Sequence, residues 1–294
     1  MNCSKGQTIS AALERGTAGK PLFVTVKGTC TEHVTIARDD VTLQGDPESG
    51  GTVGGPDSST DVIVVTGNRT RLENLTITGG NNGIRVGGMF NVALHKIVVL
   101  GAANHGVLVR AGDVSITSSR VEQAGVDGLH LQRQASARVV ESLFGKNQGS
   151  GIIAQQGSSL SATWCIIDDN AANGIRIMTG SQATLIDNSV TWNGSDGIIG
   201  YLGSILDLQG NEVSFNQESG VVGNANATLQ MVGVGIVHNH GDGIVLVRGS
   251  KLILEEPNSD SNDNDNFGLY CDDDSSVNNL SLLNTNGPVS CTGY

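Results

Sequence analysis

Residues 170–198, NAANGIRIMTGSQATLIDNSVTWNGSDGI, hold one full period of a repeat that extends through most of the 294-residue chain. Each period ends on a glycine followed by an apolar residue, at Gly83, Gly106, Gly128, Gly151, Gly174, Gly197, Gly220, Gly243 and Gly268. An asparagine stands four residues before six of these glycines, at Asn147, Asn170, Asn193, Asn216, Asn239 and Asn264. A period of 22 to 25 residues is typical of a solenoid with one coil per repeat. An inward asparagine in a turn can bond both its own coil and the asparagine of the next coil, which explains the column.

Apolar residues recur in three short runs within each period. In the period of Gly174 they are Ile175, then Ala183 and Leu185, then Val190. Alternation within such runs indicates β-strands with one face turned inward. Three strands per coil predict an all-β fold, a right-handed parallel β-helix with three walls and about nine coils, or a rod of roughly 43 Å. A leucine-rich repeat is excluded, because it needs helical segments and no stretch shows a 3.6-residue period.

The two ends of the chain depart from the repeat, as capping units do. Residues 8–15, TISAALER, predict a short amphipathic helix that closes the N-terminal end of the core. We expect a single domain over residues 1–294, with an N-terminal cap at 1–30, coils at 31–254, and a C-terminal turn and cap at 255–294. The acidic stretch 255–266 breaks the apolar pattern and is expected to protrude.

Composition narrows the classes of partner. With 29 acidic and 17 basic residues the formal net charge is −12, so nucleic acid and anionic membranes would be repelled. No stretch reaches the roughly 18 apolar residues of a membrane span. No basic segment followed by an apolar run opens the chain, which leaves either a cytoplasmic protein or one whose leader was replaced by a start codon.

The cysteines lie mainly at the two ends. Cys3 and Cys30 flank the first segment, Cys271 and Cys291 flank the last, and Cys165 stands alone in mid-chain. Disulfides at both ends would secure termini that have a neighbour on one side only, and they indicate an oxidising compartment. Four reduced thiols in a cytosolic protein are the alternative. Zinc ligation is disfavoured, since no CxxC or Cys/His spacing is present.

With these columns in place, the chain resembles the pectin-lyase-like superfamily of right-handed parallel β-helix proteins. The segments CSKGQTISAAL (3–13), VTVKGTCTEHVTI (24–36) and DDVTLQG (39–45) resemble the N-terminal cap and first coils of secreted bacterial β-helix repeat proteins. The segment DNFGLYCDDDSSV (265–277) resembles their C-terminal element. The resemblance implies the fold, supports export to the periplasm or the medium, and supports both disulfides. It leaves the activity open, because the Asp-Pro-His-Asp motif of uronan epimerases and the complete polygalacturonase set are absent.

Candidate catalytic residues lie along one wall. His105 and Asp127 stand just before Gly106 and Gly128, so they should meet on adjacent coils, near His130. A histidine held by an aspartate can abstract the proton alpha to a uronate carboxyl group, which is the reaction of polysaccharide lyases. Residues two and four positions after each glycine should point outward on this wall, and there Arg85, Arg110 and Arg176 would bind the substrate carboxylates. The alternative is that these polar residues are ordinary turn formers.

Aromatic side chains supply further candidates for sugar binding. Trp164 is a candidate platform for a sugar ring, provided that its strand is regular there. Trp192, Phe215 and His238 align immediately before the asparagine column. Strand alternation from the inward Val190 places that column inside, so we expect a stack of rings in the core.

Two features concern ions and partners. Asp260, Asn262 and Asn264 match the start of a Ca²⁺ loop, although the glycine and glutamate that complete such a loop are missing. No cofactor is required by the sequence. An outward apolar stretch, comprising Ile199, Tyr201, Val222, Val245 and Val247, would form an exposed patch. We expect the C-terminal tail with its three leucines to cover it, and association between protomers is the alternative.

The sequence therefore supports two functional hypotheses. The first is an exported carbohydrate-active or carbohydrate-binding protein, in its enzyme form a lyase of an acidic polysaccharide. The second is a structural or adhesive β-helix module without catalysis. The missing motifs and the regular coils of residues 147–247 both favour this second hypothesis.

Overall fold

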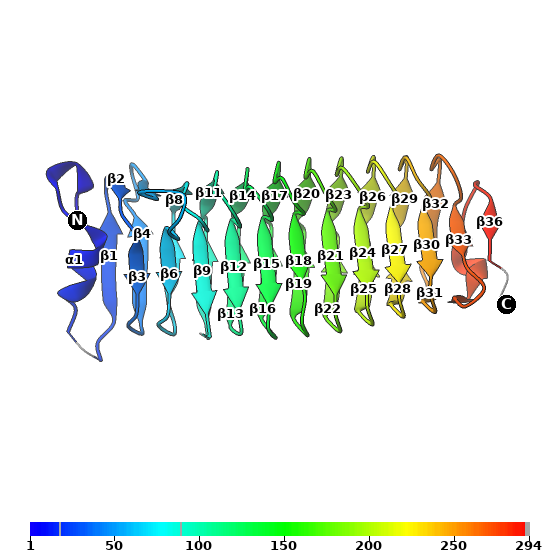
Figure 1. The fold of residues 1–294 in the computed structure, drawn as a ribbon, viewed down its shortest axis with the longest axis horizontal. Helices are drawn as coiled ribbons and strands as arrows, with labels where there is room; N and C mark the ends of the chain where they lie inside the picture. Colours follow the sequence, from blue (N-terminus) through cyan, green and yellow to red (C-terminus); the bar gives the residue numbers. More distant parts are fainter. Residues whose placement is uncertain (18, 89, 292–294) are drawn as a thin grey trace.

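The computed structural model describes residues 1–17, 19–88 and 90–291, which wind into an all-β solenoid with three parallel sheets (Figure 1). The first sheet comprises β1 (Leu22–Val26), β4 (Val41–Gly45), β7 (Arg71–Glu73), β10 (Val92–His95), β13 (Asp113–Thr117), β16 (Ser136–Val140), β19 (Ser159–Thr163), β22 (Gln182–Ile186), β25 (Ile205–Gln209), β28 (Thr228–Val232), β31 (Lys251–Glu255) and β34 (Ser276–Asn278). The second comprises β2 (Gly28–Thr31), β5 (Gly51–Gly54), β8 (Leu75–Thr78), β11 (Val98–Leu100), β14 (Arg120–Glu122), β17 (Leu143–Gly145), β20 (Ile166–Asp168), β23 (Ser189–Thr191), β26 (Glu212–Ser214), β29 (Gly235–Val237), β32 (Ser259–Asn262) and β35 (Leu283–Asn284). The third comprises β3 (Val34–Ile36), β6 (Ile63–Val65), β9 (Ile84–Gly87), β12 (Val107–Arg110), β15 (Leu129–Gln132), β18 (Ile152–Ala154), β21 (Ile175–Met178), β24 (Ile198–Tyr201), β27 (Val221–Asn224), β30 (Ile244–Val247), β33 (Leu269–Cys271) and β36 (Val289–Ser290).

Equivalent residues of successive coils stack directly on one another. In the third sheet Ile175 pairs with Ile198, one 23-residue period later. The side chain at this position is buried in every coil from β9 to β33, so the alternating pattern of the sequence is confirmed as the pattern of burial there. The glycine column follows from this packing: a Cβ on Gly174 would lie 2.4 Å from Val190 Cγ1 and 2.7 Å from the carbonyl oxygen of Gly197.

The asparagine column forms a buried hydrogen-bond ladder at the turn between the second and third sheets. The Asn193 side-chain nitrogen donates to Asn216 Oδ1 at 2.9 Å and to the carbonyl oxygen of Ile167 at 3.2 Å. The other two corners carry their own ladders, which the sequence did not reveal. At one the Asn188 side chain donates to Asn211, and at the other the backbone N–H of Ser158 donates to the hydroxyl of Ser181. The ladders thereby satisfy most of the polar groups that the corners bury, although the Ser204 hydroxyl in the serine ladder lacks a partner.

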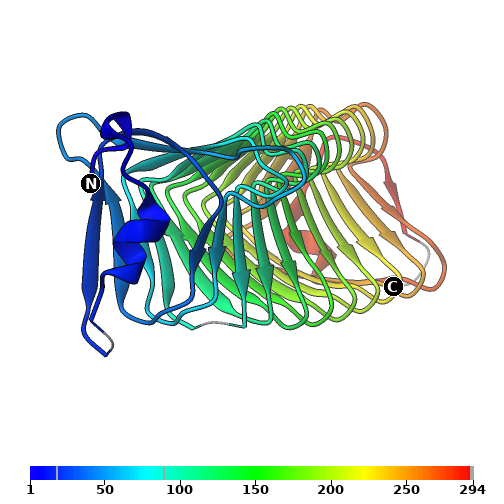
Figure 2. The ribbon, with the colours of Figure 1, turned by 60° about the vertical axis from the view of Figure 1, so that its left-hand side comes forward.

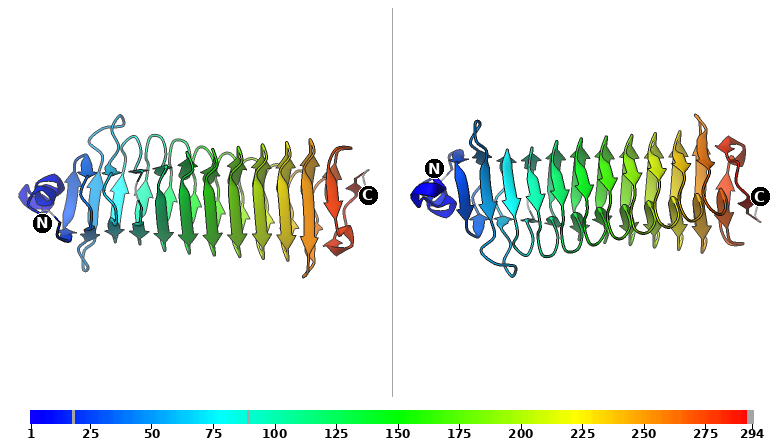
Figure 3. Two further views of the ribbon diagram at one scale, coloured as in Figure 1. Left: turned by 90° about the horizontal axis from the view of Figure 1, so that it is seen from below. Right: turned by 90° about the horizontal axis from the view of Figure 1, so that it is seen from above.

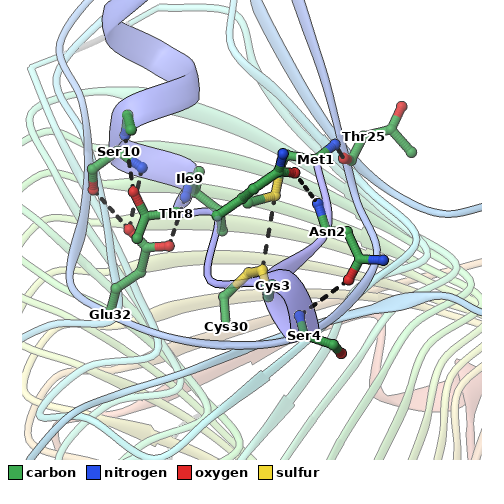
Figure 4. The surroundings of a disulfide bond; sticks show 12 residues. Met1, Asn2, Cys3, Ser4, Thr8, Ile9, Ser10, Thr25, Cys30 and Glu32 are labelled. Carbon is green, nitrogen blue, oxygen red and sulfur yellow. Dashed lines mark hydrogen bonds between the residues drawn. A yellow bond between two sulfur atoms is a disulfide. The ribbon is translucent and has the colours of Figure 1, made fainter.

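The N-terminal end is closed as expected by the helix α1 (Ile9–Glu14), which follows the short η1 (Cys3–Lys5) in the chain (Figure 2). The Thr8 side chain caps α1 by accepting a hydrogen bond from the Ala11 backbone N–H. The Glu32 carboxylate also accepts from two N–H groups of the first turn (Figure 4). Ile9 is fully buried against the first coil, so α1 covers apolar surface that would otherwise face water.

The disulfides lie where the cysteine positions predicted them. Cys3 is bonded to Cys30 beside α1 (Figure 4), and Cys271 is bonded to Cys291 in the last coil. Cys165 is free and buried, and burial raises the pKa of its thiol to about 11.

The number of coils was underestimated. Each sheet has twelve strands, against about nine coils predicted from the glycine column. The first coil begins at Leu22, inside the segment expected to be a cap, and β32 to β36 continue the stack through the segment expected to be a turn and cap. Loops that protrude from the first coils, drawn in blue, explain why the period was hidden there (Figure 3).

The chain after β33 completes the last coil and closes the C-terminal end. Leu280 and Leu282 of η2 (Leu280–Leu282), with Leu283 after it, pack against the end of the core. The expectation that this tail covers the apolar stretch of the third sheet is therefore wrong, because the open end of the core takes these leucines instead. Within the described residues, no helix is long and apolar enough to cross a membrane.

Candidate functional site

The outer face of the third sheet carries a ladder in which basic and apolar side chains alternate. Arg85, Leu108, His130, Ile153 and Arg176 occupy equivalent positions of β9, β12, β15, β18 and β21, and each pairs with the next. The inward neighbours of these residues fill the core, so the strand pleat turns this ladder outward. The two arginines therefore lie two coils from His130, on opposite sides of it.

His105 and Asp127 lie in the turns that lead into this sheet. The His105 backbone N–H donates to Asn82 Oδ1 at 3.1 Å, and the Gly106 N–H donates to the Asp127 carbonyl oxygen at 3.0 Å. These bonds tie each turn to the next coil. The two side chains consequently meet on adjacent coils, beside the first residues of β15.

The three side chains converge on one oxygen atom. Asp127 Oδ2 lies 2.9 Å from His130 Nδ1 and 3.3 Å from His105 Nδ1. The two imidazole rings are 4.4 Å apart, and both side chains are only 12% exposed, against 5% for Asp127. The other carboxylate oxygen, Oδ1, accepts the backbone N–H of Ser150 at 3.0 Å. The cluster is therefore a nearly buried carboxylate enclosed by two rings and one peptide N–H.

Asp127 is held as a carboxylate. Burial on its own would raise its pKa, but interactions with His105 and His130 and the Ser150 N–H outweigh burial and hold the pKa well below its ordinary value. A fixed negative charge therefore lies between the two imidazole rings.

The two histidines differ in their remaining contacts. His130 is held at both nitrogens, since its Nε2 lies 2.8 Å from the side-chain nitrogen of Gln155 on the next coil. An amide donor at Nε2 places the ring proton of His130 on Nδ1. His105 Nδ1 is buried but is not aligned for a hydrogen bond to Asp127. None of the described residues hydrogen-bonds its Nε2, so His105 is the less constrained ring of the pair.

The arginines are not equivalent. Arg85 Nε donates to Asp61 Oδ2 at 2.6 Å, and Asp61 also accepts from Asn82. Although burial alone would raise the pKa of Asp61, these hydrogen bonds lower it, so its charge neutralises Arg85. Arg110 and Arg176 form no ion pair with any described residue. Of the three arginines predicted to bind substrate, these two are the ones whose charge is free.

Trp164 lies away from this cluster. It stands in the turn between β19 and β20, at the corner of the first and second sheets, with a positive φ of 53°. The residue is 57% exposed and its Nε1 donates to Asp187 at 3.2 Å. It borders a surface hollow of about 600 Å³ together with Arg120 and Ile166. The ring is outward, as a sugar platform requires, but the His105–Asp127–His130 cluster is at a different corner.

The core stack expected for Trp192, Phe215 and His238 is wrong. The three rings do stack, with centroids 4.6 and 5.2 Å apart, but Trp192 is 54% exposed. Each residue follows its strand with a positive φ of 57° or 58°, which turns the chain and sends the side chain outward. The strand alternation that predicted burial ends one residue earlier.

The predicted Ca²⁺ ligands each have a protein partner. Asp260 Oδ1 accepts from the Asn284 side chain at 2.8 Å, and Asn262 Oδ1 accepts from the Asn286 N–H at 2.7 Å. Asn264 is the last rung of the asparagine ladder, with its Oδ1 bonded to Asn239. The Ca²⁺ site stays a prediction. Among the described residues, the group of His, Cys, Asp and Glu side chains that could hold a metal ion is instead His105, Asp127 and His130.

Sequence reasoning named His105, Asp127 and His130 but missed the residues that hold them. Gln155 contacts His130 diagonally across the sheet, and Asp61 holds Arg85 from a coil whose repeat is irregular. For Gln155 a signal existed, since it lies four residues after Gly151 and therefore on the same outer face. For Asp61 the irregular spacing removed any signal.

The family model described as the right handed beta helix region matches residues 61–204 and 173–287. The fold is similar to the A-module of the mannuronan C-5 epimerase AlgE4 of Azotobacter vinelandii, with a TM-score of 0.73 and 13% identity, covering 97% of this chain and 95% of that one. It is also similar to pectate lyase Pel9A (TM-score 0.61, 14% identity, 97% and 76% covered) and to the periplasmic alginate epimerase AlgG (0.60, 10%, 97% and 82%). No protein of curated function matches the chain in sequence. At these identities the similarity to solved structures establishes the shared fold.

Proposed function

The chain belongs to the right-handed beta helix family, and from that premise we propose that it is an exported protein that acts on an acidic polysaccharide along the outer face of its third sheet. The observation that carries the proposal is the convergence of His105 and His130 on the buried Asp127 carboxylate. The similar folds of alginate epimerases and a pectate lyase support it, because the names of those proteins indicate acidic polysaccharides as their substrates.

The reaction that suits the cluster is β-elimination. His105 Nε2 accepts the proton from C5 of a uronate residue, and the electron pair released forms the C4–C5 double bond. The C4–O glycosidic bond breaks, and water protonates the leaving oxygen. Asp127 stabilises the imidazolium that forms on His105, since it holds a negative charge 3.3 Å from Nδ1.

The surrounding residues take supporting roles. His130, fixed between Asp127 and Gln155, positions the carboxylate of Asp127 rather than accepting the proton. The free guanidinium groups of Arg110 and Arg176 neutralise the substrate carboxylate and so stabilise the negative charge that develops beside it. Arg85, neutralised by Asp61, contributes less to substrate binding than the other two arginines.

Location follows from the disulfides. Two disulfides at the ends of the chain persist in an oxidising compartment, so we place the protein in the periplasm or outside the cell. A polysaccharide substrate is available in both.

A structural or adhesive module is the second candidate. The regular coils of residues 147–247 favour it, because a uniform rod suits a spacer as well as it suits an enzyme. The two candidates differ in whether the histidine cluster performs chemistry.

Activity on a panel of uronans, followed through the ultraviolet absorbance of the unsaturated product, tests the proposal. We expect elimination on at least one uronan, and a loss of at least roughly 100-fold in kcat for His105→Ala. His240→Ala is the matched control, because His240 also contacts an aspartate, Asp265 at 3.1 Å, but on an exposed turn. Absence of activity on every uronan, or full activity in His105→Ala, would contradict the proposal.

A further inference from the structure

The His105–Asp127–His130 cluster has the donor set of a transition-metal site. It offers two imidazole nitrogens and one carboxylate oxygen, all within 4.8 Å of one another. Two histidines and one carboxylate are ligands that zinc accepts, with a fourth position left for water or another small ligand. These atoms come from three different segments, the turns before Gly106 and Gly128 and the strand β15.

The spacing suits a tetrahedral ion. Bonds of about 2.0–2.1 Å at tetrahedral angles hold two ligand atoms roughly 3.3 Å apart. Asp127 Oδ2 lies 3.3 Å from His105 Nδ1 and 2.9 Å from His130 Nδ1. The two observed distances lie at this value and just below it.

One nitrogen of the cluster has no satisfactory partner in the protein alone. His105 Nδ1 is buried from solvent and lacks an aligned hydrogen bond, although a carboxylate oxygen is near. Buried polar atoms of this kind are rare in folded proteins and call for an explanation. An ion bound to His105 Nδ1 and Asp127 Oδ2 would satisfy both atoms.

The outer contacts are those of a metal centre. Histidines that bind metals usually hydrogen-bond through their second nitrogen, and carboxylates that bind metals accept further hydrogen bonds. Here Gln155 contacts His130 Nε2, and rotation of its amide presents Oε1 to an Nε2–H. The Ser150 N–H fixes the other oxygen of Asp127.

From these contacts we propose that His105, Asp127 and His130 bind a divalent transition-metal ion, with Zn²⁺ as the ion that fits best. The inference concerns the cluster named in the proposed function but does not depend on that function. The two roles exclude each other, because an ion on Nδ1 leaves the proton of His105 on Nε2 and blocks proton abstraction there. Bound Zn²⁺ is therefore an inhibitor of the proposed elimination.

The test is titration of the full chain, stripped of metal by a chelator, with ZnCl₂ by isothermal titration calorimetry and with CoCl₂ by visible absorption. We expect one Zn²⁺ per chain and a Co²⁺ spectrum of tetrahedral type. His105→Ala and His130→Ala should each weaken binding by at least roughly 10- to 100-fold. His240→Ala should bind as the parent does, and circular dichroism verifies that each variant is folded.

Asp127→Asn removes the charged ligand, but it also alters the turn at Ser150, so His105→Ala provides the decisive comparison. His105 accepts no hydrogen bond at its buried nitrogen, and its removal leaves Asp127 and His130 in contact. Absence of Zn²⁺ binding, or unchanged affinity in folded His105→Ala, overturns the metal site. Because no polysaccharide enters this titration, its outcome is separate from the presence or absence of elimination activity.

Discussion

The side-chain nitrogen of Asn193 donates a hydrogen bond to the side-chain oxygen of Asn216, 2.9 Å away on the next coil, and both residues are fully buried. Asn193 also accepts from Asn170 on the coil before, so each rung satisfies the next. Any change of one rung leaves polar atoms unpaired on both neighbouring coils.

Asn193→Ala should therefore lower the free energy of unfolding by about 2 to 4 kcal/mol, since it leaves buried donors and acceptors without partners. Denaturant titration followed by circular dichroism measures the change. Asn173→Ala is the control, because Asn173 bonds to Ser195 and Asp196 on a partly exposed turn. Equal losses in the two variants would show that the ladder contributes nothing beyond an ordinary turn.

Gly174→Ala should destabilise the chain by several kcal/mol, on the order of 2 to 4, because the new methyl group meets Val190 and the Gly197 carbonyl at the close distances given above. Gly87→Ala, on the same sheet, introduces a methyl group with no atom within 4 Å. Its effect should stay below about 1 kcal/mol. Thermal unfolding of both variants measures the two changes in stability. A Gly174→Ala variant as stable as the parent would exclude packing as the reason for the glycine column.

Asp196 gives a pH dependence of stability. Burial, aided by the charge of Glu218, raises its pKa to about 6, against an ordinary value of 3.8. Between these two values the unfolded chain has lost the proton and the folded chain retains it, so stability falls as pH rises from about 4 to about 6. Above pH 6 the buried charge carries its full cost.

Asp196→Asn should accordingly raise the free energy of unfolding by roughly 3 kcal/mol at pH 7.5 and by almost nothing at pH 4. Glu218→Gln should give a smaller gain in the same direction. Unfolding curves at the two pH values provide the measurement, and a gain that is the same at both would rule out the raised pKa as the cause.

The disulfide Cys3–Cys30 closes a separation of 27 residues. By loop entropy, Cys30→Ser should cost roughly 3.5 kcal/mol of stability. Mass spectrometry without reductant should find both terminal disulfides in the parent chain and one free thiol, at Cys165. Cys165→Ser serves as the control for the stability measurement, because Cys165 forms no disulfide. Four free thiols at the ends in the mass spectrum would contradict both the disulfide pairing and the placement in an oxidising compartment.

The fold was predictable where physical constraints repeat. Gly174 and Asn193 each recur at 23 residues because a core position and a turn position recur, so the period, the three walls and the inward columns could be read from the sequence. The first coils could not be counted, because loops such as the one between β5 and β6 change the spacing without interrupting the sheets.

The candidate site was predictable only in part. Register alone placed His105, Asp127 and His130 on adjacent coils. The contact of Gln155 with His130 and the neutralisation of Arg85 by Asp61 depend on side-chain rotation, which a repeat does not specify. The side chain of Trp192 was predicted to point inward, but its positive φ turns it outward, against the direction that strand alternation assigns.

The caps that close the two ends of the core have a consequence for how this molecule can change in evolution. A stack of equivalent coils has no inherent stopping point, so α1 and the disulfide-linked last coil are what limit its length. Duplication or loss of one 23-residue unit after Gly197 would lengthen or shorten the rod while the caps still fit. The histidine cluster, confined to coils before that point, would keep its geometry. The length of the rod and the geometry of the histidine cluster can therefore be selected independently in this chain.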